Sequence, residues 1–73
     1  MVKNEFIIIC VHGEILTIEQ YRGSKLIYKH DLDLLESECQ KDLFNVMMKH
    51  NEEIPLVISW KDLKFLRKIG LRV

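Results

Sequence analysis

The first thirty residues carry the hydrophobic patterns of β-strands separated by tight turns. The apolar, β-branched run at Glu5–Val11 predicts a strand that is buried on both faces and therefore central in its sheet. A turn at Gly13 leads into Glu14–Arg22, which alternates as a returning strand, and a turn at Gly23 leads into Lys25–His30. We therefore expect a three-stranded antiparallel meander.

From Asp31 onward the hydrophobic period changes from two residues to 3.6, which predicts an α-helix. Asp33 followed by Glu36 fits a capping box at its start, and Asn51 is a suitable residue to end it. We expect the main apolar stripe of this helix to pack on the sheet. That stripe contains Leu35, Cys39, Leu43, Val46 and Met47.

The last twenty residues predict a short strand and a second helix. Ile54–Ile58 is the fourth strand, with its proline at the start where no ladder bond is lost. Ser59 caps a helix over Trp60–Ile69, and Gly70 ends that helix with Leu71 as the apolar partner of the cap. The expected fold is α+β: one small domain over residues 1–73, with a four-stranded, mainly antiparallel sheet and two helices on one face, in the order β-β-β-α-β-α.

Composition indicates which class of protein this is and in which compartment we expect it. The chain has 73 residues, of which 48% are hydrophobic, so it is too apolar for a disordered segment. Its longest apolar run, Phe6–Val11, is too short to cross a bilayer, and no secretory leader is recognised at the start. Cys10 and Cys39 fall among apolar residues and are expected as free thiols in a reducing compartment. We therefore expect a cytoplasmic protein with no membrane partner.

Charge is balanced overall but unevenly distributed along the chain. Residues 31–53 carry seven acids and two bases, whereas residues 54–73 carry five bases and one acid. Three interpretations of the basic C-terminal helix stay open: a solvated face, a contact for an acidic protein surface, or a nucleic-acid contact. The cations are Lys61, Lys64, Arg67 and Lys68, within about 120° of the helix circumference, and Arg72 beyond its end.

No motif for catalysis or metal binding is found. None of the three serines lies in a nucleophile elbow, and the three glycines do not form a phosphate-binding loop. The three histidines and two cysteines lack the paired spacings of zinc sites. We therefore expect a protein that is not an enzyme and that has no cofactor and no metal.

Three apolar residues are candidates for a partner-binding surface. Phe44 and Met48 lie one turn apart on the side of the first helix opposite its main stripe, and an exposed pair of this kind suits a protein partner or a weak two-fold homodimer. The alternative is that the last helix covers both residues as part of the core. Trp60, at the start of the last helix, is either a lid of the core or an interface anchor.

These features predict a small non-catalytic protein-interaction module that acts as a regulatory or inhibitory accessory protein. Its small size, taken alone, suggests a viral or phage origin. The alternative function is a small nucleic-acid-binding regulator that uses the basic C-terminal helix. Nucleic acid is the less favoured partner, because that helix lacks the Asn and Gln side chains that read bases.

Overall fold

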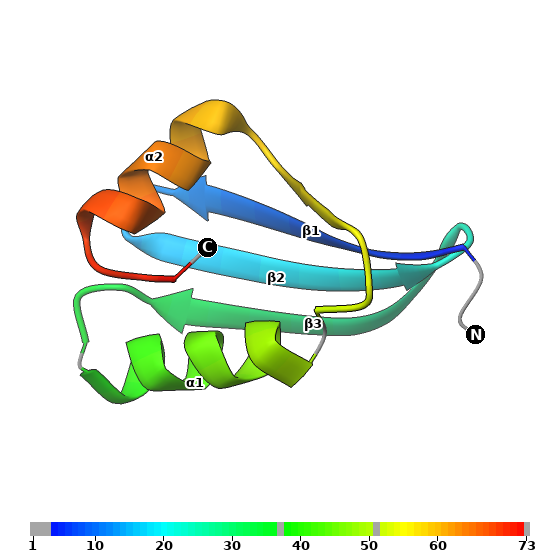
Figure 1. Ribbon diagram of the computed structural model, residues 1–73, viewed down its shortest axis with the longest axis horizontal. Coiled ribbons are helices and arrows are strands. Elements are labelled where there is room, and N and C mark those ends of the chain that lie inside the picture. Colours follow the sequence, from blue (N-terminus) through cyan, green and yellow to red (C-terminus); the bar gives the residue numbers. More distant parts are fainter. Residues whose placement is uncertain (1–3, 37, 51, 73) are drawn as a thin grey trace.

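Six elements follow one another in the predicted order in the computed structural model, which describes residues 4–36, 38–50 and 52–72 (Figure 1). Four strands and two helices make the fold α+β, as the sequence predicts. The elements are β1 (Glu5–His12), β2 (Ile15–Arg22), β3 (Lys25–Asp33), α1 (Glu38–His50), β4 (Leu56–Ile58) and α2 (Trp60–Lys68).

The four strands form one mixed sheet in the order β3-β2-β1-β4. The pairs β1–β2 and β2–β3 are antiparallel, whereas β1 and β4 are parallel because the chain crosses over through α1 to reach the far side of β1. The amide of Ile7 donates a hydrogen bond to the carbonyl oxygen of Pro55 (2.9 Å) where β4 joins β1. The prediction that Glu5–Val11 forms an interior strand is confirmed.

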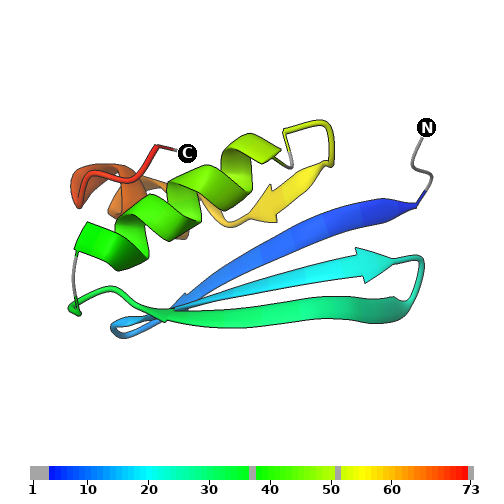
Figure 2. The same cartoon turned by 90° about the horizontal axis from the view of Figure 1, so that it is seen from below.

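Both helices lie on the same side of the sheet (Figure 2). The face of β1 and β2 toward them supplies Ile7, Ile9, Leu16 and Ile18, which are buried with Leu32 of β3. The helical layer and the C-terminal segment complete this core with Phe44, Leu66 and Leu71. Burying side chains of this size is the main favourable term for a domain this small.

The opposite face of the sheet is not covered by a helix in the described part of the chain (Figure 2). Phe6, Ile8 and Cys10 lie on this face and are half-buried. The ring of Phe6 stacks on that of Tyr21 across the β1–β2 pair, with centroids 5.4 Å apart. The expectation that this strand is buried on both faces is therefore wrong for its outer face, where neighbouring side chains rather than a second layer shield it.

The boundary between β3 and α1 differs from the prediction. The strand continues to Asp33, and the helix begins at Glu38, so the proposed capping box does not start a helix. The Asp33 carboxylate instead accepts a hydrogen bond from the amide of Leu35 (3.0 Å). The backbone carbonyl oxygen of Asp33 accepts another from the amide of Glu36 (3.2 Å). Asp33 therefore closes a turn after the strand, a role that aspartate fills as readily as a helix cap. The predicted cap Asn51 lies outside the described residues.

Both ends of α2 agree with the sequence analysis. The Ser59 hydroxyl accepts a hydrogen bond from the amide of Asp62 (3.2 Å), as an N-cap does. At the other end Gly70 has φ of 99°, and the amide of Leu71 donates to the carbonyl oxygen of Leu66 (3.0 Å). This is the bonding pattern of a Schellman cap, and the buried Leu71 side chain is its apolar contact.

Candidate interaction surfaces

Phe44 belongs to the core and not to an exposed surface. Its side chain is 0% exposed and packs within the buried cluster between α1 and the sheet. The interpretation of Phe44 as an exposed partner or dimer contact is therefore wrong, and the alternative, that it is part of the core, holds for Phe44. Met48 is half-buried against the same cluster. It also borders an open hollow of about 440 Å³ at the end of α1, together with Lys49, Glu52 and Arg72.

Two hydrogen bonds join α1 to the segment that follows α2. The Lys41 ammonium donates to the carbonyl oxygen of Ile69 (2.9 Å), and the amide of Arg72 donates to Oδ1 of Asn45 (3.2 Å). Lys41 therefore binds a carbonyl oxygen at the C-terminal end of α2, where such oxygens lack helical partners, and Asn45 binds an amide just beyond it. Phe44 lies on the adjacent side of the helix and is buried in the core.

The main apolar stripe of α1 consequently faces solvent, contrary to our expectation. Val46 is 52% exposed and Leu43 is 42% exposed, while Cys39 is also exposed. Leu35, in the turn before the helix, is 70% exposed. Met47 is the member of the predicted stripe that packs against the core. We refer to Cys39, Leu43 and Val46 as the α1 stripe.

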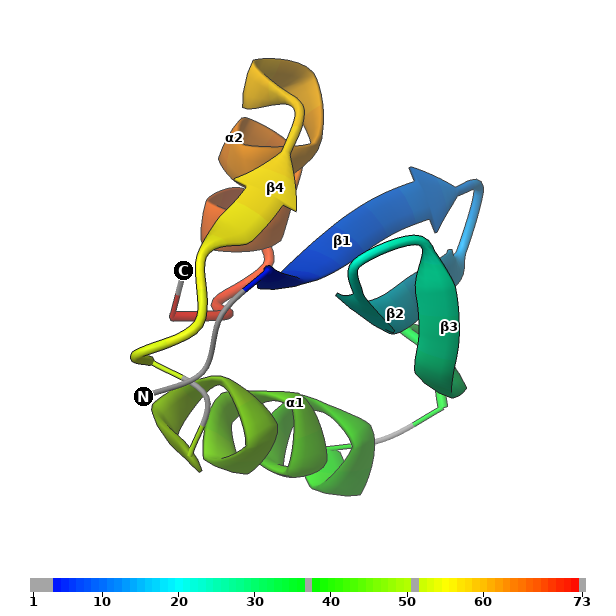
Figure 3. The ribbon, with the colours of Figure 1, turned by 90° about the vertical axis from the view of Figure 1, so that its right-hand side faces the viewer.

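The strand β3 forms a long open edge of the sheet (Figure 3). Leu26, Ile27 and Tyr28 are exposed along it. The Tyr28 hydroxyl donates to the Met47 sulfur (3.7 Å), so this edge adjoins α1. The other edge belongs to β4, which is three residues long. Long strands with apolar side chains at an open edge are surfaces on which another chain can pair.

The exposed side of α2 combines an aromatic ring with four cations, and we refer to it as the α2 face. Trp60 is 63% exposed, and the Lys64 ammonium lies 5.5 Å from the centroid of its ring. Trp60, Lys64 and Lys68 follow one another at a spacing of four residues and so share a side of the helix. A lid of the core would be buried, so this exposure agrees with the alternative that Trp60 is an interface anchor. The members of the α2 face are Trp60, Lys61, Lys64, Arg67 and Lys68, all exposed.

The acid of α2 is directed away from this face. The Asp62 carboxylate accepts a hydrogen bond from the amide of Val11 (3.3 Å) at the end of β1 and does not lie among the exposed cations. Arg72, the fifth predicted cation, lies apart from them: it lines the hollow at the end of α1 with Glu52. The structure therefore brings four of the five predicted cations together.

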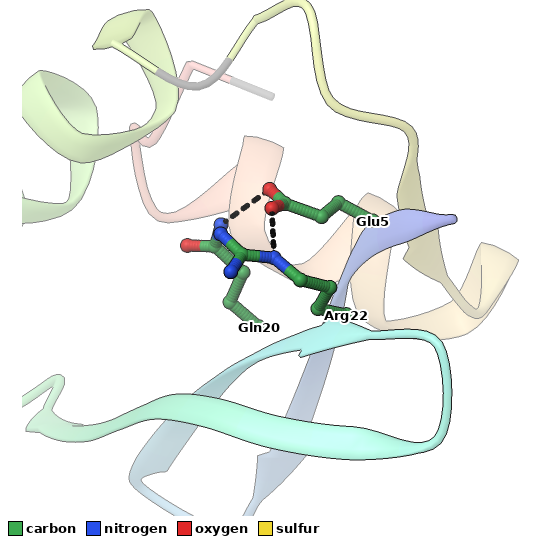
Figure 4. A network of polar contacts seen from close by, with 3 residues as sticks. All are labelled: Glu5, Gln20 and Arg22. Carbon is green, nitrogen blue, oxygen red and sulfur yellow. Dashed lines mark hydrogen bonds and ion pairs between the residues drawn. The ribbon is translucent and has the colours of Figure 1, made fainter. Parts of the chain in front are cut away.

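A polar cluster that the sequence analysis missed lies where β1 begins (Figure 4). The Glu5 carboxylate accepts hydrogen bonds from Nε of Arg22 (2.7 Å) and Nε2 of Gln20 (3.1 Å). The Glu5 side chain is 6% exposed and that of Arg22 is 66% exposed. The observed register places Glu5 opposite Arg22, whereas a strand that returns at Glu14, as predicted, would place it opposite Gln20. The cluster holds β1 against β2 and presents no open reactive group.

On the uncovered sheet face, the pKa of Tyr21 is raised from its ordinary value of 10.0. Partial burial of the phenol is the main cause, and the neighbouring negative charge and hydrogen bond of Glu19 (3.4 Å) add to it.

Within residues 4–36, 38–50 and 52–72, no three His, Cys, Asp or Glu side chains come together as a group that could hold a metal ion. Neither α1 nor α2 has the length and apolar character needed to cross a membrane. No family model, curated protein or solved structure matches this chain. The proposals below therefore rest on the surfaces of the molecule itself.

Proposed function

We propose that this protein is a non-catalytic interaction module that binds an acidic surface of a partner protein through the α2 face, and that it acts as a regulatory or inhibitory accessory protein. The observation that carries the proposal is Trp60, which is 63% exposed amid four cations. Large aromatic side chains left in water are costly, and Trp is enriched among the residues that dominate binding energy.

Burying the Trp60 ring against a partner would contribute roughly 2–3 kcal/mol. The ring stands at the beginning of a helix whose N-cap is formed by Ser59, so its backbone is already ordered. Lys64 packs over the ring, which fixes one cation beside the aromatic anchor. An ordered anchor loses less conformational entropy on binding than a mobile one.

The charge of the α2 face selects the class of partner. Lys61, Lys64, Arg67 and Lys68 lie on the exposed side, while Asp62 bonds to β1. Positive groups arranged around an apolar centre fit a partner with an apolar pocket and an acidic rim. The free thiols Cys10 and Cys39 suit the reducing cytoplasm, where we place this interaction.

The test compares three forms of the protein as baits in extracts of the native host: wild type, Trp60→Ala and Leu35→Ala. Leu35 is 70% exposed and lies outside α2, so its variant is a matched control for removing an exposed apolar side chain. A partner that binds through the α2 face should be captured by wild type and by Leu35→Ala but lost with Trp60→Ala. Capture that is equal for all three baits would contradict the proposed surface.

A captured protein is then purified and titrated directly. Trp60 is the only tryptophan of the chain, so its fluorescence reports contact at the α2 face. We expect a spectral change on binding and an affinity that falls as salt rises, because exposed charges are screened. Lys64→Glu should weaken binding about tenfold or more through reversed charge. Binding that leaves Trp60 fluorescence unchanged would place the contact elsewhere.

Nucleic-acid binding is the second candidate, and one observation favours it. Trp60 supplies an aromatic platform within a basic helix face, on which an unpaired base could stack. Single-stranded and duplex oligonucleotides of mixed sequence test this directly. If the α2 face contacts nucleic acid, the logarithm of the binding constant should fall linearly with the logarithm of the salt concentration, with a slope of magnitude roughly three to four. The double variant Lys64→Glu, Lys68→Glu should then no longer bind. No binding at low salt would reject this function.

A further inference from the structure

The backbone of β3 shows which of its groups are open to another strand. The amide of Leu34 donates to the carbonyl oxygen of Glu14 beside β2 (2.8 Å). In an antiparallel pair, residues alternate between those whose N–H and C=O groups face the neighbour and those whose groups face away. Alternate residues from Tyr28 to Leu32 therefore face β2, whereas Lys29 and Asp31 direct their backbone groups out of the sheet.

The charged side chains of this edge distinguish among the registers in which it could pair with itself. Two antiparallel copies keep their helices on one side of a joint sheet only if residues of the same face lie opposite each other. An axis through Lys29 sets the two lysines against each other, and an axis through Asp31 does the same with the aspartates. An axis through His30 sets Lys29 of each copy opposite Asp31 of the other. Closer to the turn between β2 and β3 the ladder is irregular: Gln20 lies opposite Tyr28 but Tyr21 lies opposite Leu26, so Ile27 has no residue opposite it.

We propose that two copies of this chain pair antiparallel along β3, with His30 on the two-fold axis, and form one continuous eight-stranded sheet. In this register the outward backbone groups of Lys29 and Asp31 bond to those of the other copy. Their side chains form two opposite-charge pairs, and Tyr28 lies opposite Leu32 on the helical face. The open edge is thereby removed.

Helix α1 adjoins the same edge through Met47. Met47 contacts Tyr28 of β3, and Leu43 and Val46 are its neighbours on the helix, on the side away from Phe44. A two-fold axis normal to the sheet places the α1 of the second copy across the axis, on the same face of the joint sheet.

This interface is separate from the α2 face. Helix α1 lies beside β3, whereas α2 lies at the side of the sheet that carries β1 and β4 (Figures 1 and 3). The dimer therefore leaves both copies of the α2 face accessible, and either proposal can fail without the other.

Charge reversal tests the register. Lys29→Asp places two like-charge pairs at the interface, and so does Asp31→Lys; each should weaken the dimer about tenfold, because both pairs occur twice. The two variants mixed together should dimerise with each other, since each then meets opposite charges on its partner. The double variant with both changes should dimerise as wild type does. Sedimentation at about 100 μM, where a weak dimer is populated, measures all four.

The folded state of each variant is checked by circular dichroism, because Lys29 lies opposite Glu19 within the same chain and its reversal loses that intrachain pairing. Asp31 lies opposite Thr17, so Asp31→Lys is the milder change. If Lys29→Asp unfolds, Asp31→Lys still tests the interface, because it leaves the pairing of Lys29 with Glu19 intact.

Cross-linking gives an independent measurement of the axis. His30 would form a pair without hydrogen bonds to its copy, where Cα atoms lie about 4.5 Å apart, within the range of a disulfide. With Cys10 and Cys39 replaced by serine, His30→Cys should oxidise to a covalent dimer, and Lys29→Cys should do so far more slowly. A strictly monomeric wild type at about 100 μM would overturn the proposal. So would equal dimerisation of wild type and both single reversals, or cross-linking that favours position 29.

Discussion

Replacing Phe44 by alanine tests the rotation of α1. The ring is fully buried among residues of the sheet, α2 and the C-terminal segment. Removing a buried phenylalanine ring costs about 3–5 kcal/mol, of which part is lost transfer energy and part the cavity left behind. A chain of 73 residues has a free energy of unfolding of roughly 4–11 kcal/mol. Phe44→Ala should therefore remove a large fraction of the stability and lower the urea midpoint accordingly.

The matched control is Val46→Ala on the same helix. Val46 is 52% exposed, so little apolar contact is lost, and alanine favours a helix over valine by about 0.5 kcal/mol. These terms nearly cancel, and the free energy of unfolding should change by less than about 0.5 kcal/mol. Circular dichroism at 222 nm during urea unfolding measures both variants, since Trp60 is exposed and reports poorly on the core.

The reverse result would refute the packing described here. If Val46→Ala cost several kcal/mol and Phe44→Ala almost nothing, the main apolar stripe would face the sheet as its hydrophobic period predicts. Should Phe44→Ala be too unstable to purify, Phe44→Leu keeps most of the buried volume and should cost about 1–2 kcal/mol, which a urea titration resolves.

Three further changes test other parts of the fold. Arg22→Met leaves the buried Glu5 carboxylate without its cation and should lower the free energy of unfolding by about 1–3 kcal/mol, and Glu5→Gln in that background should recover part of the loss in urea titrations. Gly70→Ala should lower the free energy of unfolding by about 1–2 kcal/mol in the same assay, because a residue with a Cβ is strained at a φ of 99°. No larger cost is expected, since no neighbouring atom lies within 4 Å of the added Cβ. Glu19→Gln should lower the raised pKa of Tyr21 toward 10.0, followed by ultraviolet absorbance of tyrosinate; an unchanged titration would remove Glu19 as a cause.

Periodicity predicted the strands and α2 well because each is determined by local patterns. The apolar run of β1 and the glycine turns define the meander, and Ser59 and Gly70 define the ends of α2 with bonds made within a few residues. The start of α1 was missed because Asp33 serves equally as a turn former after a strand and as a helix cap. Two local interactions of similar strength competed there, and the sheet register favoured the turn.

The side of α1 that faces the core could not be predicted from a local hydrophobic pattern. A helical wheel ranks sides by hydrophobicity, and by that measure Cys39, Leu43 and Val46 belong inside. The observed orientation instead packs Phe44 with Leu66 and Leu71, and it brings Lys41 and Asn45 to Ile69 and Arg72, which lie 28 and 27 residues further along the chain. Among the candidate site residues, the four cations of α2 were grouped correctly because they share one helix. The burial of Phe44 depended on that distant segment.

The placement of β4 affects how the chain must fold. Strand β1 is the first element, yet one of its two sides is completed by β4, some fifty residues later. Until the C-terminal residues arrive, the N-terminal meander presents the bare edge of Ile7, Ile8 and Ile9, a β-branched apolar segment of the kind that aggregates. Because β4 covers this edge, we expect chains truncated before β4 to be prone to aggregation.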